Sequence, residues 1–113
     1  MDAMPEDTVT PSRAVAASLR TIRESLGLTG TALAARCAVR GAPHMTAFVL
    51  GSIERGTRRV ISVDDLLTLA SVLDVTPADL LDTGTRLSVT DTVTVTPARL
   101  RAWLAGKALP RTS

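Results

Sequence analysis

Six times along this chain, a threonine or a serine stands directly before a segment whose apolar residues recur at helical spacing. Their hydroxyl oxygens accept hydrogen bonds from the first free amides of a helix, so they mark helix beginnings. At three of the six, proline follows at the first helical position, where its missing N–H costs little. The chain is therefore predicted to fold as a series of short helices, begun by Thr10, Thr29, Thr46, Ser62, Thr76 and Thr96.

Glycines and a proline predict where these helices end. Gly27 and Gly56 each follow an apolar periodic segment, at the position where a left-handed cap is favoured. Gly41 and Pro43 exclude a helix between residues 38 and 45, so we expect a loop there. Residues 11–82 then contain five helices, of which the first three cover about 11–26, 30–37 and 48–55.

The last thirty-one residues have a different pattern. Residues 87–90 and 93–96 alternate apolar and polar side chains and are rich in valine and threonine, which is typical of a hairpin or of a single strand. A final helix carries Leu100, Trp103 and Leu104 on one side. We therefore divide the chain into a flexible acidic arm (1–10), one compact domain (11–82) and a C-terminal tail (83–113).

Charge is distributed unevenly along the chain. Residues 12–60 contain eight arginines and only two acidic residues, whereas residues 61–82 contain five aspartates and no basic residue. Positive charge gathered in one supersecondary unit favours a polyanionic partner. An ordinary solvated surface is the alternative if charge is considered alone.

Several classes of function lack the residues that they need. Cys37 and His44 are the only residues of their kinds, so an internal disulfide is excluded and a zinc site would lack ligands. No nucleophile has a plausible base, so we expect neither an enzyme nor a cofactor. The chain has no apolar run of membrane-spanning length, and its acidic beginning differs from a signal peptide. These features predict a cytoplasmic protein without a membrane partner.

Four segments resemble, in order and spacing, the λ-repressor-like (XRE or Cro-C1-type) helix-turn-helix family. The resemblance covers about Leu19 to Leu81, and the segments read LRTIRESLGLT, TALAARCAV, FVLGSIERGTRR and SVDDLLTLASVLDVTPADLLD. The resemblance implies an all-α fold, a five-helix helix-turn-helix domain with a short β/helical tail, in a bacterial or phage-encoded protein that binds double-stranded DNA. It also implies a structural pair between Arg23 and Glu54. The turn before the third helix is longer than is usual in the family.

The third helix would then enter the major groove, held by apolar contacts of Leu33, Ala34, Leu50 and Ile53. The resemblance assigns base readout to Thr46, Ala47, Phe48, Gly51 and Ser52. This set contains no arginine, asparagine or glutamine for a bidentate pair with a base, so specificity would depend on apolar contact with thymine methyls, on DNA shape or on arginines elsewhere. For Phe48, a place in the core is the alternative.

Contacts with the DNA backbone are implied for a second set: Thr29, Thr31, Arg40, His44, Arg55, Arg58 and Arg59. Phosphate contacts of this kind position a protein on the duplex but carry little sequence information. Gly30 stands where the family usually has a glutamine that contacts a phosphate. For Arg40 and His44, a mobile solvated loop is the alternative.

We therefore predict a sequence-specific transcriptional regulator, in particular a repressor that binds a pseudo-palindromic operator as a homodimer. The tail is a candidate dimerisation element, through a strand edge and Trp103, unless it folds back on its own domain. One alternative is the antitoxin of a toxin-antitoxin pair, which would bind its own operator and a protein toxin. Another is a phage immunity or Cro-type switch protein.

Overall fold

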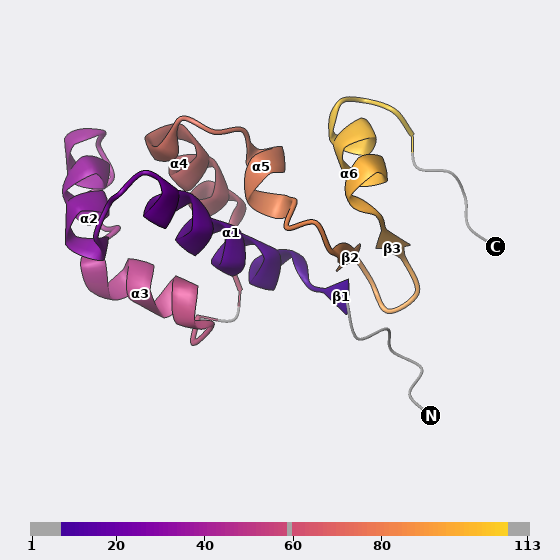
Figure 1. The fold of residues 1–113 in the computed structure, drawn as a ribbon, viewed down its shortest axis with the longest axis horizontal. Helices are drawn as coiled ribbons and strands as arrows, with labels where there is room; N and C mark the ends of the chain where they lie inside the picture. Colours follow the sequence, from indigo (N-terminus) through magenta and orange to yellow (C-terminus); the bar gives the residue numbers. More distant parts are fainter. Residues whose placement is uncertain (1–7, 59, 109–113) are drawn as a thin grey trace.

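The computed structural model describes residues 8–58 and 60–108, which form six helices and a small three-stranded sheet (Figure 1). The expected mostly helical fold with a short β/helical tail is confirmed. In chain order, the elements are β1 (Thr8–Val9), α1 (Pro11–Ser25), α2 (Gly30–Val39), α3 (Ala47–Arg55), α4 (Val63–Leu73), α5 (Pro77–Leu81), β2 (Arg86–Ser88), β3 (Thr94–Val95) and α6 (Pro97–Leu104).

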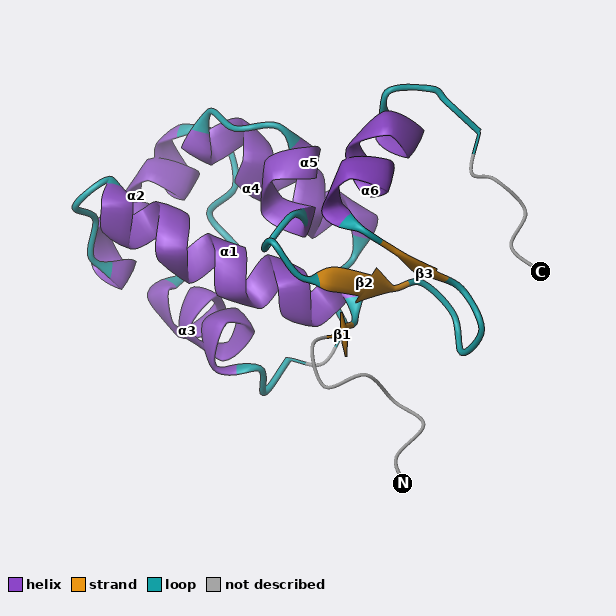
Figure 2. Ribbon diagram, turned by 45° about the vertical axis from the view of Figure 1, so that its right-hand side comes forward, coloured by secondary structure: helices purple, strands orange, loops and turns teal. Residues whose placement is uncertain are grey.

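The first five helices pack around one hydrophobic cluster, which we call the main cluster. The long helix α1 runs through the middle of the domain and contacts α3, α4 and α5 (Figures 1 and 2). The cluster is almost entirely aliphatic, as the near absence of aromatic residues requires, and burying such side chains stabilises the fold. Its largest fully buried members are Val15, Leu19, Leu33, Met45, Leu50, Ile53, Leu69, Val72 and Leu80.

Each predicted helix beginning is confirmed. In every helix of the described residues, the side chain of the expected threonine or serine accepts a hydrogen bond from the amide three residues later. Thr76 and Asp79 form a reciprocal pair of such bonds, a full capping box. Gly27 and Gly56 have positive φ values of 72° and 78°, the left-handed geometry expected after a helix.

The turn between α2 and α3 is long but anchored. Helix α2 continues to Val39, two residues beyond the expected end, because the helix is broken only at Gly41. In the turn that follows, Ala42 and Met45 are only 6% and 1% exposed and belong to the main cluster. The amide of Ala42 also donates to the carbonyl of Cys37 at 2.8 Å. The lengthened turn therefore contributes to the core through Ala42 and Met45.

The tail folds back onto its own domain. Strand β2 pairs antiparallel with β3, so of the two alternatives the hairpin forms, and β2 pairs parallel with β1 on its other side. Thr8 and Val9 therefore lie in a sheet, although the sequence places them in a flexible arm. Behind the sheet lies a second hydrophobic group, which we call the tail cluster, made of Ala14, Leu87, Val95 and Leu100.

Candidate nucleic-acid interface

Helix α3 is fixed from behind by apolar contacts. Leu50 and Ile53 are at most 1% exposed and point into the main cluster, where Leu33 of α2 is also fully buried. Ala34 is partly buried against the same cluster. Because buried side chains are closely packed, α3 and α2 are held as one rigid unit. Of the four residues predicted to hold α3, three are buried and one is partly buried.

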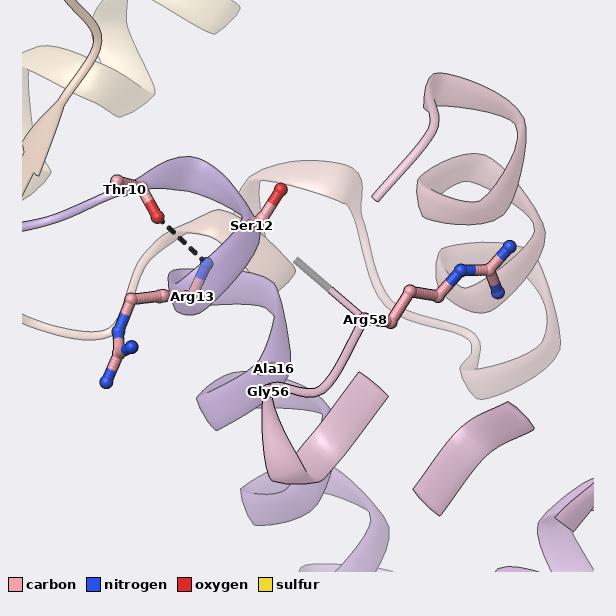
Figure 3. Close-up of a pocket in the computed structure, with 6 residues that line it drawn as sticks. All are labelled: Thr10, Ser12, Arg13, Ala16, Gly56 and Arg58. Carbon is pink, nitrogen blue, oxygen red and sulfur yellow. Dashed lines mark hydrogen bonds between the residues drawn. The ribbon is translucent and has the colours of Figure 1, made fainter. Parts of the chain in front are cut away.

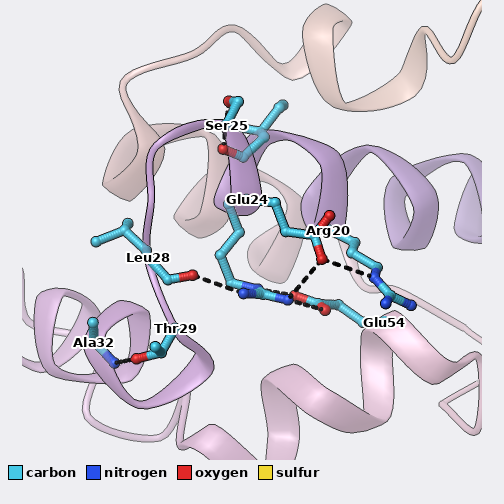
Figure 4. Close-up of polar contacts among 9 residues, drawn as sticks. Arg20, Glu24, Ser25, Leu28, Thr29, Ala32 and Glu54 are labelled. Carbon is cyan, nitrogen blue, oxygen red and sulfur yellow. Dashed lines mark hydrogen bonds and ion pairs between the residues drawn. The ribbon is translucent and has the colours of Figure 1, made fainter.

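A polar joint adds to this packing, and it confirms the pair implied by the resemblance. Arg23 Nε and Nη2 donate to the two carboxylate oxygens of Glu54 at 2.7 and 2.9 Å, and Arg23 Nη1 donates to the carbonyl of Leu28 at 2.7 Å. Figure 4 shows these contacts between α1, the segment before α2, and α3. The hydrogen bond to Glu54 raises the pKa of Arg23. One arginine thus connects three parts of the helix-turn-helix unit.

The opposite face of α3 is open. Thr46, Ala47 and Phe48 are exposed, and Gly51 and Ser52 are partly exposed. Phe48 has 77% of its surface exposed, so the alternative that it is a core aromatic is wrong. The structure therefore gathers all five residues predicted for base readout at the outer side of one helix.

The hydroxyl groups of Thr46 and Ser52 on this face form hydrogen bonds with the backbone of α3. Thr46 Oγ1 accepts a hydrogen bond from the amide of Val49 at 3.2 Å, as the cap of α3. Ser52 Oγ donates to the carbonyl of Phe48 at 3.0 Å. The donor of Ser52 is thereby satisfied within α3, and Thr46 is held in the geometry that its capping role requires.

The side chain of Arg55 is directed along the same face, toward the beginning of α3. A Cβ atom placed on Gly51 would come within 2.7 Å of Arg55 Nη1 and 3.4 Å of Cζ, so the guanidinium occupies the space that a side chain at residue 51 would fill. Arg55 also lines a shallow depression of about 560 Å³ together with Phe48, Val49, Ser52, Thr57 and Arg58. The sequence suggested Arg55 only as a backbone contact at the end of the helix.

The turn after α3 has a defined geometry. Gly56 provides the left-handed cap, and the amides of Thr57 and Arg58 both donate to the carbonyl of Ser52 at 3.1 and 3.2 Å. Arg58 is exposed, and its Nη2 lies 3.5 Å from Oδ2 of the nearly buried Asp65 at the start of α4. Arg59, which the sequence also predicts as a backbone contact, lies outside the described residues.

A hollow beside this turn contains an arginine that the sequence-based prediction omits. It has a volume of about 400 Å³ and is lined by the beginning of α1 and the turn after α3, with Arg13 and Arg58 on its two sides (Figure 3). The amide of Ile61 donates to Ser12 Oγ at 3.0 Å and ties the two segments together. Arg13 lies 43 residues from Gly56 in sequence, so only the packing of α1 against α3 reveals this proximity.

The remaining predicted backbone contacts are separated. Thr29 and Thr31 are exposed at the beginning of α2, where Thr29 Oγ1 caps the amide of Ala32. His44 is exposed in the long turn. Arg40 instead contacts α4 and its end: its guanidinium donates to the carbonyl of Ser71 at 3.2 Å and lies 3.7 Å from the carboxylate of Asp74.

Other kinds of site receive no support from the described residues. Burial raises the pKa of the Cys37 thiol, which keeps it in the poorly nucleophilic neutral form. Among residues 8–58 and 60–108, no three histidine, cysteine, aspartate or glutamate side chains are placed to hold a metal ion. Within the same ranges, no helix has the length and apolar character needed to span a bilayer.

Comparison with known proteins agrees with this geometry. A family model described as a helix-turn-helix domain matches residues 14–83, which is more than half of the chain. The match covers most of α1, all of α2 to α5 and the long turn, and it confirms the resemblance drawn from the four sequence segments. No curated protein and no solved structure matches the chain significantly.

Proposed function

This chain belongs to the helix-turn-helix domain family, and we propose that it is a transcriptional regulator, specifically a repressor, which binds an operator through α3. The observation that carries the proposal is the position of α3. Its inner face is fixed by Leu50 and Ile53, while its outer face is open and has arginines nearby. A rigid helix presented in this way is what the major groove accepts.

Apolar contacts form one part of the proposed base readout. Ala47 and Phe48 are exposed at the first turn of α3, the part of a recognition helix that reaches base edges. The thymine C5-methyl group is the apolar feature of the major groove, and alanine and phenylalanine side chains can contact it. We therefore expect the operator to place thymines against these two residues.

Backbone contacts are proposed on two sides of α3. On one side are Thr29 and Thr31, whose amides and hydroxyls stand at the N-terminus of α2, where the helix dipole favours a phosphate. On the other side are Arg13 and Arg58, at the hollow beside the end of α3. Arg59 is proposed with them from its sequence position alone.

Selection of bound sites from random DNA tests the proposal directly. We expect one enriched sequence with thymines in each half-site, and the absence of any enriched sequence would contradict the proposal. Gel shifts over a salt series then test the backbone contacts. Arg13→Ala should weaken binding to all sequences and reduce the slope of log K against log[salt] by about one unit. Arg99→Ala, an exposed arginine of α6, serves as the matched control and should leave the slope unchanged.

We also propose that the repressor binds as a homodimer, because a single module of this size contacts only one half-site. The apolar side chains of the tail sheet are used inside its own protomer, and the outer strands β1 and β3 have only two residues each. A more exposed apolar surface is formed by Val60, Val63 and Leu67, which are 74%, 70% and 51% exposed. It follows the turn that carries Arg58, so a second copy docked there would lie close to the DNA.

Two single substitutions, each of which introduces a negative charge on one of the two surfaces, test which surface mediates dimerisation. Val63→Asp should abolish the dimer on a two-half-site operator and leave binding to a single half-site intact. Trp103→Asp on α6 should leave the dimer in place. Light scattering of the protein with each DNA measures both, and the reverse result would move the interface to the tail.

A further inference from the structure

Within α3, one side chain on the outer face has several free hydrogen-bond donors. This is Arg55, in the last turn of the helix. Residues four and seven positions apart in a helix share a face, so Gly51, Phe48 and Arg55 lie along one line. Cβ atoms in a helix tilt toward its N-terminus, which directs the side chain of Arg55 back toward the other two. The position of its guanidinium at Gly51 agrees with this direction.

We infer that Arg55 reads a guanine in the major groove, and that the lack of a side chain at Gly51 provides the space in which its guanidinium lies. This inference rests on the proposed function, and it names a base-reading residue that the five predicted positions lack. Planar guanidinium groups form two parallel hydrogen bonds to O6 and N7 of guanine, the most common specific contact between proteins and DNA.

The surroundings of Arg55 favour a base over a phosphate. The guanidinium lies at Gly51, one helical turn before the turn that contains Arg58, and it shares a depression with Phe48 and Ser52. Arg58 lines the separate hollow, where the phosphate contact is proposed. Ser52 Oγ donates within α3, so its donor does not compete with Arg55 for the base edge.

Free donors distinguish Arg55 from most arginines of the domain. Arg20, Arg23, Arg36, Arg40 and Arg58 each lie within 4.0 Å of a carboxylate. No ion pair or side-chain hydrogen bond of Arg55 is found within residues 8–58 and 60–108. A guanidinium that is positioned by backbone shape and not by a salt bridge keeps its donors for a ligand.

Arg55→Lys separates base readout from charge, because lysine keeps the positive charge and loses the planar fork. In selection from random DNA, the wild-type protein should enrich a guanine at one position of each half-site. The preference of Arg55→Lys for that guanine should fall about 5- to 150-fold, with less than about a twofold change in affinity for unrelated DNA. Arg99→Lys is the matched control and should select the wild-type site.

Gly51→Ala tests whether the space at residue 51 positions the guanidinium of Arg55. The new methyl group would meet Arg55 Nη1 at 2.7 Å and displace the guanidinium, so the same guanine preference should fall. Alanine is a better helix former than glycine, so the melting temperature should rise, and loss of folding cannot explain the result. The double variant Gly51→Ala/Arg55→Lys should be no less selective than Arg55→Lys alone.

The outcomes separate this inference from the proposed function. A wild-type protein that enriches no sequence overturns the proposed function and the inference together. A wild-type protein that enriches a site without guanine, or an Arg55→Lys variant with unchanged preference, overturns the role of Arg55 and leaves the proposed function intact. A double variant less selective than both single variants, or a Gly51→Ala variant with unchanged preference, overturns the role of Gly51 in positioning Arg55.

Discussion

Ala14 and Val15 are neighbours in α1, yet their side chains enter different hydrophobic clusters. Val15 packs into the main cluster, whereas Ala14 packs into the tail cluster with Leu87, Val95 and Leu100. The main cluster holds the surface proposed to read DNA. The tail cluster covers the other side of α1 with segments from both ends of the chain. Damage to the two clusters should therefore have different consequences.

The largest effect is expected in the main cluster. Leu50→Ala removes a side chain that is 1% exposed at the inner face of α3. The free energy of unfolding should fall by about 4 kcal/mol, because a cavity is left in addition to the lost burial. DNA binding should weaken with it. Urea denaturation and gel shifts measure the two quantities. Leu104→Ala, at a half-exposed leucine of α6, is the control and should change neither markedly.

The polar joint of the same region should be nearly as sensitive. Glu54→Gln leaves the largely buried Arg23 without its carboxylate, and we expect a loss of about 3 kcal/mol in the free energy of unfolding. Glu24→Gln is the comparison: Glu24 is exposed, pairs with Arg20 at 3.3 Å and lies 4.0 Å from Arg23 Nη2, so it should contribute at most about 1 kcal/mol. Equal effects of the two substitutions in urea denaturation would mean that the joint does not hold α3.

A smaller effect is expected in the tail cluster. Leu100→Ala removes a side chain that is 2% exposed, but the neighbouring strands are short and can relax into the space. We expect a loss of about 2 kcal/mol, at the lower end for such a substitution. Affinity for the operator should stay within about twofold, because α3 is untouched. Loss of operator binding by the folded variant would show that the two clusters are coupled.

Acid should act on the tail with the smallest effect of all. Arg101 of α6 donates to Asp82 at 2.7 Å and to Asp79 at 3.0 Å. Arg101 lowers the pKa of Asp82, and the amide of Thr76 followed by Arg101 lowers the pKa of Asp79, both from the usual 3.8. Because the folded pKa values are lowered, the stabilisation is complete above pH 3.8 and is lost as the pH falls below it.

Fluorescence of Trp103, the single tryptophan, reports this change because it lies in α6 two residues from Arg101. We expect its emission to shift below pH 3.8 before the helical circular dichroism of the whole chain decreases. Arg101→Ala should remove that early shift. A shift that persists in the variant would assign the acid effect to other carboxylates.

The beginnings of the helices could be predicted from the sequence because they depend on short-range contacts. Each cap joins residues three apart, as in the bond from the amide of Asp65 to Ser62 Oγ. The same holds for the apolar inner face of α3, which follows from the spacing of Leu50 and Ile53. The helix-turn-helix match, which depends on the order of such local signals, was predictable for the same reason.

The site was predicted less completely. The open face at residues 46–52 follows from helical periodicity, but the exposure of Phe48 depends on whether the long turn covers it. The turn is instead held by Ala42 and Met45, and their burial depends on the shape of the main cluster. Arg13 was missed because its neighbours lie far away in sequence. Arg55 was predicted only as a backbone contact, because the free space at Gly51 becomes visible only in three dimensions.

The sequence by itself determined where the helices begin, which faces are apolar and to which family the chain belongs. Tertiary structure alone decided the partners of the charged side chains, such as Arg40 with Asp74, and the pairing of Thr8 and Val9 with Arg86 and Leu87. The physical reason is the sequence separation of the residues that contact one another. A cap or an apolar stripe is satisfied within one or two helical turns, whereas contacts between distant residues depend on how all the buried faces pack together.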